Sequence, residues 1–329
     1  MRLLILGGTR FVGIHVARSL VAAGADVTLL HRGVTNASIP GARFVVGDRS
    51  QPDGLAGLGS ERFDAVLDMS AYFSDWTRTA AEALAGRVAH YVFVSSGAVY
   101  RPSAELPWPE TTPFGPIPIW GRYGEEKIAS ERLLWDAHAS GHFAVTAFRF
   151  PFILGPGNFA DRESFIFSRL EARRPILLPD DGVAVNQFVY VGDVARALVA
   201  ALERPDRSGG EAYNCTHASV ITNRGWAELC AEVAGCEPWL VPIDEHALGV
   251  ASETVDLTDI VFPYPAAHYA LDGSKLARDL GVEMTTGNRR MLEEYWNTWD
   301  QVPDHTPRRY AREDKALAAL ELDGAEMPA

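Results

Sequence analysis

Short apolar runs alternate with helical stretches over the first half of the chain. Each run is long enough for one strand, and the positions between the first two runs, through Leu20 and Ala23, have helical spacing. Strands that are apolar on both faces are typical of parallel sheets that crossover helices cover on both sides. The pattern predicts an α/β protein with a doubly wound parallel sheet, whose strands lie at residues 3–6, 25–30, 43–46, 65–68, 91–94 and 145–150.

The alternation loosens after residue 150, where proline and glycine become frequent. A strand-like run returns at 187–191, and a helix follows at about 193–203. This change predicts two interleaved domains and a tail. We expect a nucleotide-binding domain at 1–153 and about 184–206, a smaller α/β substrate-binding domain at 154–183 and 207–304, and a tail helix within 305–329.

The amino-acid composition argues against two classes of binding partner, nucleic acids and membranes. The 329 residues carry 30 basic and 43 acidic side chains, a net charge of −13, so the chain should repel a phosphate backbone and we expect no nucleic-acid partner. The apolar runs are shorter than the roughly 20 residues that cross a bilayer, so we expect no membrane partner. Three cysteines without C-x-x-C spacing favour a reducing compartment, the cytoplasm.

The glycine turn at residues 7–13 is the first candidate site. It follows a predicted strand and opens a helix, so backbone N–H groups and the helix dipole would face a pyrophosphate there. Gly7 would make the tight turn and Gly13 would let the helix pack closely on the strand, although Arg10 stands where a third glycine is often found. An ordinary strand-to-helix turn is the alternative. The candidate cofactor-binding residues of this turn are Gly7, Thr9, Arg10, Phe11, Val12 and Gly13.

The end of the second predicted strand bears on the choice of cofactor. Folds that prefer NAD place Asp or Glu there to hold the ribose hydroxyls, whereas this chain has His31 and Arg32. Together with Arg10, Arg32 would grip a 2′-phosphate, which favours NADP over the alternative, NAD. A solvated surface arginine is the other interpretation of Arg32. Asp48, with Arg49 beside it, is either a ligand for the cofactor's adenine or an ordinary turn residue.

A serine, a tyrosine and a lysine form the most informative pattern. Ser96 ends a predicted strand, and Tyr123 and Lys127 stand four apart on a predicted helix, so both can face one ligand. A free phenol has a pKa of about 10, and a nearby ammonium together with the positive nicotinamide ring of an oxidised cofactor favours its ionisation. Ser96 would hydrogen-bond the reacting oxygen. A surface helical pair is the alternative, which the chain's few lysines make uncommon by chance.

Several motifs together carry a resemblance to a known family. They are the turn at 7–13, Val-Ser-Ser-Gly-Ala-Val-Tyr at 94–100, the Tyr123/Lys127 pair, Arg-Phe-Pro at 149–151, and the segments 188–195 and 272–281. With these motifs the chain resembles the extended short-chain dehydrogenase/reductase superfamily, in its NAD-dependent epimerase/dehydratase group. The resemblance extends over nearly the whole chain.

The resemblance implies a Rossmann domain, a catalytic triad of Ser96, Tyr123 and Lys127, and a small C-terminal domain that closes over the substrate. It also implies that Lys127 binds the nicotinamide ribose and that the protein is a homodimer. Further cofactor contacts would come from Met69 and Ser70, beside the pyrophosphate and ribose, and from Phe150 and Pro151, beside the nicotinamide.

Departures from the family's motifs bear on the substrate. Gly97 and Ala98 stand where sugar-nucleotide dehydratases have an Asp-Glu pair, so we set that elimination aside. Asn186 and Gln187 replace the Arg-Asp pair of nucleotide-sugar epimerases, so a diphosphate lacks its usual partner unless the arginines at 162, 169, 173 and 174 serve instead. The candidate substrate-binding residues are Ser96, Trp120, Tyr123, Phe152 (in place of the epimerases' Asn) and Asn186.

A proline-rich segment at 101–122 leads directly into Tyr123. Its aromatic side chains, Trp108, Phe114 and Trp120, would either wall the substrate pocket or pin the loop to the core. No metal site is expected, because a possible histidine pair further along the chain lacks a third ligand.

The sequence is compatible with three functions. The leading one is an NAD(P)-dependent oxidoreductase that acts at a secondary alcohol or ketone of a small molecule, with Tyr123 exchanging the proton. The alternative is a sugar or nucleotide-sugar epimerase that oxidises transiently with the same three residues. A non-catalytic RNA-binding protein is the third, because the opening turn resembles a branch of the superfamily with chloroplast RNA-binding members. The net charge of −13 and the intact triad weigh against it.

Overall fold

The computed structural model describes residues 1–35, 38–115, 118–253, 258–302 and 304–322. The chain divides into two compact units. Unit 1 comprises Met1–Ile153, Val189–Ala218 and Leu271–Thr285, and unit 2 comprises Leu154–Phe188, Ser219–Ala270 and Thr286–Ala329. All the predicted catalytic and cofactor-binding residues lie in unit 1, whereas Asn186 lies in unit 2.

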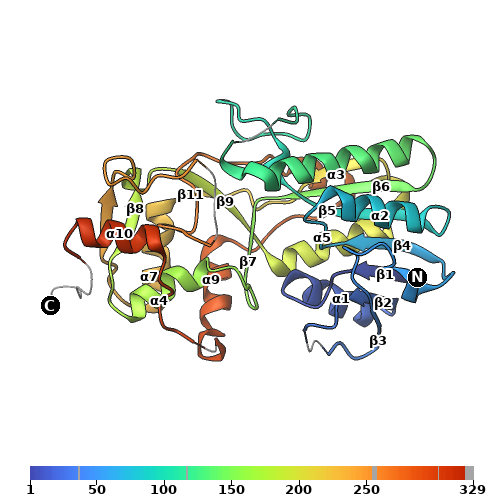
Figure 1. The fold of residues 1–329 in the computed structure, drawn as a ribbon, viewed down its shortest axis with the longest axis horizontal. Coiled ribbons are helices and arrows are strands. Elements are labelled where there is room, and N and C mark those ends of the chain that lie inside the picture. The colour runs from blue at the N-terminus through green and yellow to red at the C-terminus, as the bar shows by residue number, and fades with distance from the viewer. Residues whose placement is uncertain (36–37, 116–117, 254–257, 303, 323–329) are drawn as a thin grey trace. The chain divides into compact units, whose positions relative to one another are not determined.

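A seven-stranded sheet forms the centre of unit 1 (Figure 1). Its order is β3-β2-β1-β4-β5-β6-β10, and each neighbouring pair is parallel. The predicted doubly wound parallel sheet is therefore confirmed, with each predicted strand found within a few residues of its expected place. The strands are β1 Arg2–Leu6, β2 Asp26–His31, β3 Ala42–Val46, β4 Phe63–Asp68, β5 Val88–Ser96, β6 Ala144–Phe150 and β10 Glu211–Asn214.

Helices cover both faces of this sheet because its central strands are apolar on both sides. Alternate residues of β1 point to opposite faces, so Leu3 and Ile5 pack in one core while Leu4 and Leu6 pack in the other. The first core includes residues of α1, α5 and α8, and the second includes residues of α2 and α3 (Figure 1). The helices of unit 1 are α1 Val12–Ala22, α2 Ser74–Leu84, α3 Gly121–Ala139, α5 Val191–Glu203, α6 Pro205–Ser208 and α8 Ser274–Leu280.

The strand order reverses direction between β1 and β4. In open parallel sheets a ligand binds beyond the carboxyl ends of the strands at such a point. The residues that follow β1 and β4 in the chain are the glycine turn at 7–13 and the pair Met69 and Ser70. The topology therefore brings together two segments that the sequence predicted to contact one cofactor.

Short strands and helices form unit 2 and its junctions with unit 1. One sheet has the order β11-β9-β7, with β11 antiparallel to β9, and a second pairs β12 with β8 in parallel. The strands are β7 Phe152–Leu154, β8 Ile176–Pro179, β9 Val185–Tyr190, β11 Val220–Thr222 and β12 Leu240–Ile243. The helices are α4 Glu163–Glu171, α7 Asn223–Ala234, α9 Asn288–Trp296 and α10 Ala311–Ala319. The 3₁₀ turns of the chain are η1 Ala56–Leu58, η2 Gly97–Val99, η3 Pro118–Trp120, η4 Asp180–Gly182 and η5 Trp299–Gln301.

The division of the chain differs from the predicted one at three segments. Residues 184–188, predicted to lie in the nucleotide-binding domain, belong to unit 2. Residues 207–218 and 271–285, predicted to lie in the substrate domain, belong to unit 1. The first contains β10, which pairs with β6 and adds the seventh strand, and the second contains α8, whose Leu276 and Leu280 join the first core. With only four residues in β10 and seven in α8, neither element carries a long enough apolar pattern to signal this placement.

The tail packs within unit 2 through α10. Arg169 Nε donates to Glu313 Oε1 at 2.7 Å, Arg169 Nη2 donates to the Arg308 carbonyl at 3.1 Å, and both charged side chains are buried. This ion pair assigns Arg169, one of the arginines considered for a diphosphate, to the packing of the tail. Residues 323–329 of the predicted tail lie outside the described residues.

Glu163 is a buried carboxyl at the start of α4. Its Oε1 accepts from the Gly155 N–H at 2.8 Å and its Oε2 accepts from Asn158 Nδ2 at 2.7 Å, so it ties the glycine-rich loop before α4 to the helix. Burial raises the pKa of Glu163 from 4.5 to about 7, although both hydrogen bonds oppose the change.

This raised pKa predicts a pH-dependent loss of stability. Because the folded state binds a proton more tightly than the unfolded state, the contribution is complete below pH 4.5 and is lost as the pH rises through about 7. Relative to Glu163→Gln, the unaltered protein should lose up to about 3 kcal/mol of unfolding free energy across this window. Urea unfolding at a series of pH values measures the difference. Glu203→Gln, at an exposed position, should show no such difference, and equal pH slopes for Glu163→Gln and the unaltered protein would refute the prediction.

Candidate active site

The turn after β1 has the glycines where space requires them. Gly7 has a φ of 95°, and a Cβ on it would lie 2.6 Å from Ser70 Cβ. A Cβ on Gly13 would lie 2.4 Å from Gly8 Cα, so only glycine allows α1 to approach the turn this closely. These are the two roles that the sequence predicted for Gly7 and Gly13, a tight turn and close helix packing.

The N-terminus of α1 fits an anionic group. Phe11, at the N-cap position, has a φ of 38°, which is a strained conformation for a residue with a bulky side chain, and strain of this kind is concentrated at ligand-binding turns. The first turn of α1 carries no acidic side chain, and no side chain among the described residues caps this helix end. The positive end of the helix dipole is therefore not neutralised by a carboxylate in its first turn, as a site for a pyrophosphate requires.

Two exposed arginines and a pair of threonines belong to this turn and to the segment that follows β2. Arg10 and Arg32 are both exposed, and Thr35 Oγ1 donates to Thr9 Oγ1 at 2.8 Å, which links the segment after β2 to the phosphate turn. This link places the segment that begins with Arg32 beside the turn that contains Arg10. The arrangement is compatible with the predicted grip on a 2′-phosphate.

Asp48 shows the contacts of a turn residue. Its Oδ1 accepts from the Ser50 N–H at 3.0 Å and from Ser50 Oγ at 2.7 Å. These hydrogen bonds, and after them the charge of Arg32, lower the pKa of Asp48. The turn interpretation of Asp48 thus has direct support, and an adenine contact would be an additional role.

Arg49 does not face a cofactor. Its guanidinium is buried and forms a bidentate ion pair with Asp68, with Nη2 2.7 Å from Asp68 Oδ2, and Nη2 also donates to the Trp76 carbonyl at 3.0 Å. Tyr91 OH donates to the same carboxylate at 2.5 Å. We therefore exclude Arg49 from the proposed cofactor ligands. In the sequence, the one feature that indicates this cluster is Asp68, a single aspartate at the end of an apolar strand, because a buried carboxylate needs a charged partner.

Met69 and Ser70 continue from β4 toward the phosphate turn. The Met69 N–H donates to the Leu6 carbonyl at 3.1 Å, and Ser70 Oγ donates to the same carbonyl at 3.2 Å. These bonds hold Ser70 against Gly7, where only a glycine leaves room for it. Both residues thus lie beside the turn, and their contacts with a pyrophosphate and ribose, which the resemblance implies, stay a prediction.

A glycine brings α3 against the end of β5. A Cβ on Gly124 would lie 2.8 Å from the Ala98 carbonyl oxygen, so the close contact between α3 and η2 depends on that glycine. Ser96 ends β5, and its Oγ accepts from the Ala98 N–H at 3.2 Å. Tyr123 precedes Gly124 in the chain, so this contact brings the segment that carries Tyr123 close to the one that carries Ser96.

Tyr123 and Lys127 share one face of α3. Lys127 Nζ lies 5.9 Å from the centroid of the Tyr123 ring and donates to the Val94 carbonyl at 2.8 Å. Lys127 is only 5% exposed, whereas Tyr123 is 39% exposed, so a partly exposed tyrosine lies beside a buried amine. Burial lowers the pKa of Lys127 to about 8, and the nearby Asp68 carboxylate opposes this change.

Phe150 and Pro151 follow from the pairing of β5 with β6. The register places Ser96 opposite Phe150, so the end of β6 lies beside the predicted catalytic serine. Phe150 is buried and stacks on Phe148 with ring centroids 5.9 Å apart, whereas Pro151 is half-buried. Of this pair, Pro151 has the accessible surface that a nicotinamide contact needs.

The chain matches the NAD dependent epimerase/dehydratase family over residues 3–216. It belongs to that family. Membership places the chain among NAD-dependent oxidoreductases and epimerases, and it confirms the family resemblance that the motifs carried.

Known relatives of this family member differ in their stated activities. A protein of Arabidopsis thaliana named chloroplast stem-loop binding protein of 41 kDa b is 30% identical over 85% of this chain and 74% of its own length. The 2′-dehydrokanamycin reductase of Streptomyces kanamyceticus is 31% identical over 76% of this chain and 67% of its own length. The fold is similar to that of the UDP-glucuronic acid 4-epimerase of Bacillus cereus in complex with UDP-glucuronic acid and NAD, with a TM-score of 0.73, 18% identity, and coverage of 92% of this chain and 100% of that one.

The aromatic residues of the proline-rich segment in this family member have two different placements. Trp108 is buried, and its carbonyl accepts from Asn214 Nδ2 at 2.9 Å, while Arg149 lies over the Phe114 ring at 4.8 Å. Trp108 and Phe114 thus attach the loop to the core of unit 1, which is the alternative to lining a substrate pocket. Trp120 instead packs on Phe152, with ring centroids 5.8 Å apart, directly before α3. Residues 116–117 of the segment lie outside the described residues.

Asn186 has a structural environment in unit 2. It is fully buried, and its Nδ2 donates to Asn223 Oδ1 at 2.9 Å, while Asn223 Nδ2 donates to the Pro265 carbonyl at 3.1 Å. This amide relay stabilises the packing of β9 against the start of α7. We therefore exclude Asn186 from the proposed substrate-binding residues.

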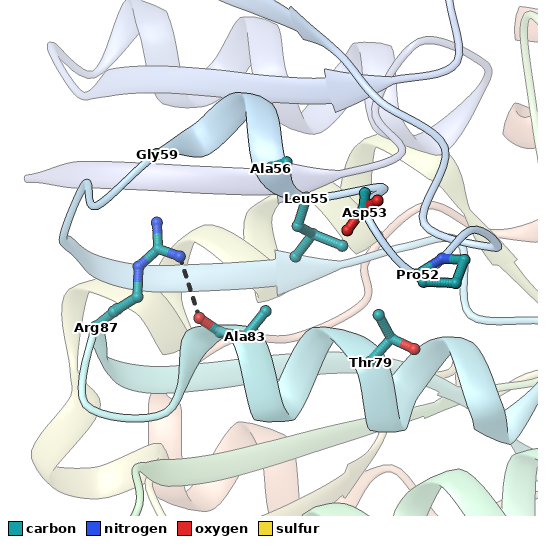
Figure 2. A pocket seen from close by; sticks show the side chains of 8 residues that line it. All are labelled: Pro52, Asp53, Leu55, Ala56, Gly59, Thr79, Ala83 and Arg87. Atoms are coloured by element: carbon teal, nitrogen blue, oxygen red, sulfur yellow. Dashed lines mark hydrogen bonds between the residues drawn. The ribbon is translucent and has the colours of Figure 1, made fainter.

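Other features of the described part of the chain lie apart from this site. A hollow of about 230 Å³ is lined by Pro52, Asp53, Leu55, Ala56, Gly59, Thr79, Ala83 and Arg87, none of them a predicted site residue (Figure 2). Figure 2 shows the Arg87 guanidinium turned to the Ala83 carbonyl, to which it donates at 3.1 Å. Within the described residues there is no cluster of three metal-ligand side chains, and no helix there is long and apolar enough to cross a membrane.

Proposed function

We propose that the protein is an NAD(P)-dependent oxidoreductase that transfers hydride at a secondary alcohol or ketone of a small molecule. The observation that carries the proposal is the partly exposed Tyr123 beside the buried amine of Lys127, on a helix whose Gly124 packs closely on η2, directly after β5. The glycine turn at 7–13, which leads into a helix without an acidic side chain in its first turn, fits the pyrophosphate of a dinucleotide.

Each of the three residues has a defined task in this proposal. Tyr123 gives its proton to the carbonyl oxygen in reduction and takes it back in oxidation. The positive charge of Lys127 favours the phenolate, and its amine holds the nicotinamide ribose. Ser96 donates a hydrogen bond to the reacting oxygen and so fixes its position. The cofactor, when bound, supplies or accepts the hydride.

The substrate in this proposal is a small ring compound rather than a nucleoside diphosphate sugar. Trp120, half-buried and three residues before Tyr123, packs on the buried Phe152 and offers an aromatic surface. Arg169, one of four arginines considered for a diphosphate, is committed to Glu313. The relative that is named a 2′-dehydrokanamycin reductase supports a ketone on a sugar ring as the first substrate class to test.

An epimerase with the same three residues is the second candidate, and the epimerases among the relatives favour it. Cofactor consumption distinguishes the two. Incubation of the protein with NADPH and a panel of ketosugars should bleach the reduced-nicotinamide absorbance in step with product. Turnover of a sugar stereocentre with no net change in absorbance would favour the epimerase and refute net reduction.

NADP rather than NAD is the cofactor we propose, and Arg32 is its test. Arg32→Ala should weaken NADPH binding by about 10- to 100-fold, because a charge-assisted hydrogen bond contributes about 1.5–3 kcal/mol. NADH binding should change by less than about threefold, since NADH has no 2′-phosphate. Fluorescence titration of both cofactors measures this, with Arg18→Ala, at an exposed position on α1, as the charge-matched control. Equal weakening of both cofactors would contradict the NADP assignment.

RNA binding is a third candidate, favoured by the name of the Arabidopsis relative. The net charge of −13 opposes contact with a phosphate backbone, so we propose no nucleic-acid partner and no membrane partner. Salt-sensitive binding of a stem-loop RNA that Tyr123→Phe leaves unchanged would instead support this candidate.

A homodimer and a cytoplasmic location also belong to the proposal. The first is implied by the family resemblance. The second is supported by the three cysteines, which are all free thiols. Sedimentation of the full chain tests the dimer.

A further inference from the structure

Asp68 is the centre of a buried polar cluster at the end of β4. It is fully buried, and Arg49, Tyr91 and the Ser70 N–H all donate to its carboxylate, the last at 3.3 Å. The pKa of Asp68 lies below its ordinary value, because the charge and hydrogen bonds of Arg49 outweigh the effect of burial. The carboxylate is therefore ionised inside the protein.

This carboxylate lies on the strand that neighbours the one Lys127 contacts. The register of β4 with β5 pairs Asp68 with Phe93, and Lys127 Nζ lies over the Phe93 ring at 4.9 Å. The same amine donates to the carbonyl of Val94, the next residue of β5. Because paired residues of neighbouring strands project to the same face, the Asp68 side chain lies on the face of the sheet against which Lys127 packs.

The groups that act on the charge of Lys127 come from the sheet side and from its own helix. Asp68 and its partner Arg49 act on the amine electrostatically, and Tyr123 and Glu131 share its helix. Glu131 is held in a second bidentate pair, since Arg149 Nη2 lies 2.6 Å from its Oε2 and Arg149 Nε 3.0 Å from its Oε1. Burial is the main cause that lowers the pKa of Lys127, and Asp68 is the foremost group that favours the charged amine.

We propose that Asp68 is a positioning residue whose buried negative charge keeps Lys127 protonated near Tyr123. The positive charge of Arg49 partly offsets the effect of Asp68 on the amine. The inference rests on the proposed function for the role of Lys127, and it names what regulates that role. Asp68 touches neither substrate nor cofactor. It acts through the lysine.

The scarcity of lysine makes the proposal directly measurable. The chain has only Lys127, Lys275 and Lys315, so protein labelled with ¹³C at lysine Cε gives three resonances, and Lys127→Arg identifies the one of interest. Titration of that resonance in the intact, ligand-free chain reports the protonation of the amine. Asp68→Asn should lower the midpoint by about one pH unit or more, a tenfold change in proton affinity, and Arg49→Gln should raise it.

Controls separate charge from structural damage. Tyr91→Phe removes one hydrogen bond from Asp68 without changing any charge near Lys127, so its midpoint should stay within about 0.3 pH unit of the unaltered protein. An unchanged midpoint in Asp68→Asn overturns the proposal. If that variant does not fold, Arg49→Gln decides, and an unchanged or lowered midpoint there overturns the proposal as well. The titration needs no substrate, so an inactive protein with the expected shifts would refute the proposed function while supporting this inference.

Discussion

Replacing Tyr123 with phenylalanine is expected to lower the rate of hydride transfer by about 10²- to 10⁴-fold, the contribution of a positioned acid–base group. The variant keeps the ring above Lys127 and removes only the hydroxyl that exchanges the proton. Tyr123 is 39% exposed, so the loss of its hydroxyl should leave the free energy of unfolding and the affinity for NADPH nearly unchanged. Single-turnover kinetics with NADPH and an accepted ketone, alongside cofactor titration, measure both effects.

A second tyrosine provides the control for this variant. The hydroxyl of Tyr213 donates to the Arg207 carbonyl at 3.3 Å on the edge strand of the sheet, and this hydroxyl has no part in the proposed proton exchange. Tyr213→Phe should therefore turn over at the rate of the unaltered protein. If Tyr123→Phe retained more than about a tenth of the activity, Tyr123 would not be the acid–base group.

Glu131→Gln is expected to lower the free energy of unfolding by about 3–5 kcal/mol, because it leaves the guanidinium of a buried ion pair without its counter-charge. Arg149 is 4% exposed, and Glu131 is 1% exposed and also accepts from Ser95 Oγ at 2.5 Å. The same network joins α3 to β5 and β6, and through α3 it supports the helix face that carries Tyr123 and Lys127. Urea denaturation followed by circular dichroism measures the loss.

A double-variant cycle isolates the charge effect. Combining Glu131→Leu with Arg149→Met removes both charges, so the double variant should be less destabilised than the sum of the two single changes. Glu125→Gln on the exposed side of the same helix should change stability by less than about 0.5 kcal/mol. Additive losses across the cycle would show that the pair is not coupled.

The sheet was predictable because its strands bury both faces. A strand such as β1, with Leu3 and Leu4 in opposite cores, has to be a continuous apolar run, and such runs are visible in the sequence. The glycines at 7 and 13 were predictable for a related reason, since each permits a close approach that a Cβ would block. Local chain geometry sufficed in both cases.

Buried polar partners were not predictable, because they depend on contacts between distant segments. Arg49 looked like a cofactor ligand from its place after β3, but its partner Asp68 is nineteen residues away and ends another strand. Asn186 matched a substrate position, yet it forms an amide pair with Asn223, thirty-seven residues further on. In each case the sequence located a polar side chain, and only the fold determined what faced it.

A crystal structure of the protein with NADP⁺ most directly tests whether Tyr123 and Lys127 act at the nicotinamide of a bound dinucleotide. We expect the pyrophosphate at the turn of residues 7–13, the ribose hydroxyls of the nicotinamide within hydrogen-bond distance of Lys127 Nζ, and the C4 atom of the ring on the side of the Tyr123 hydroxyl. A dinucleotide bound elsewhere, or a nicotinamide that lies far from the Tyr123 hydroxyl, would contradict the proposed chemistry.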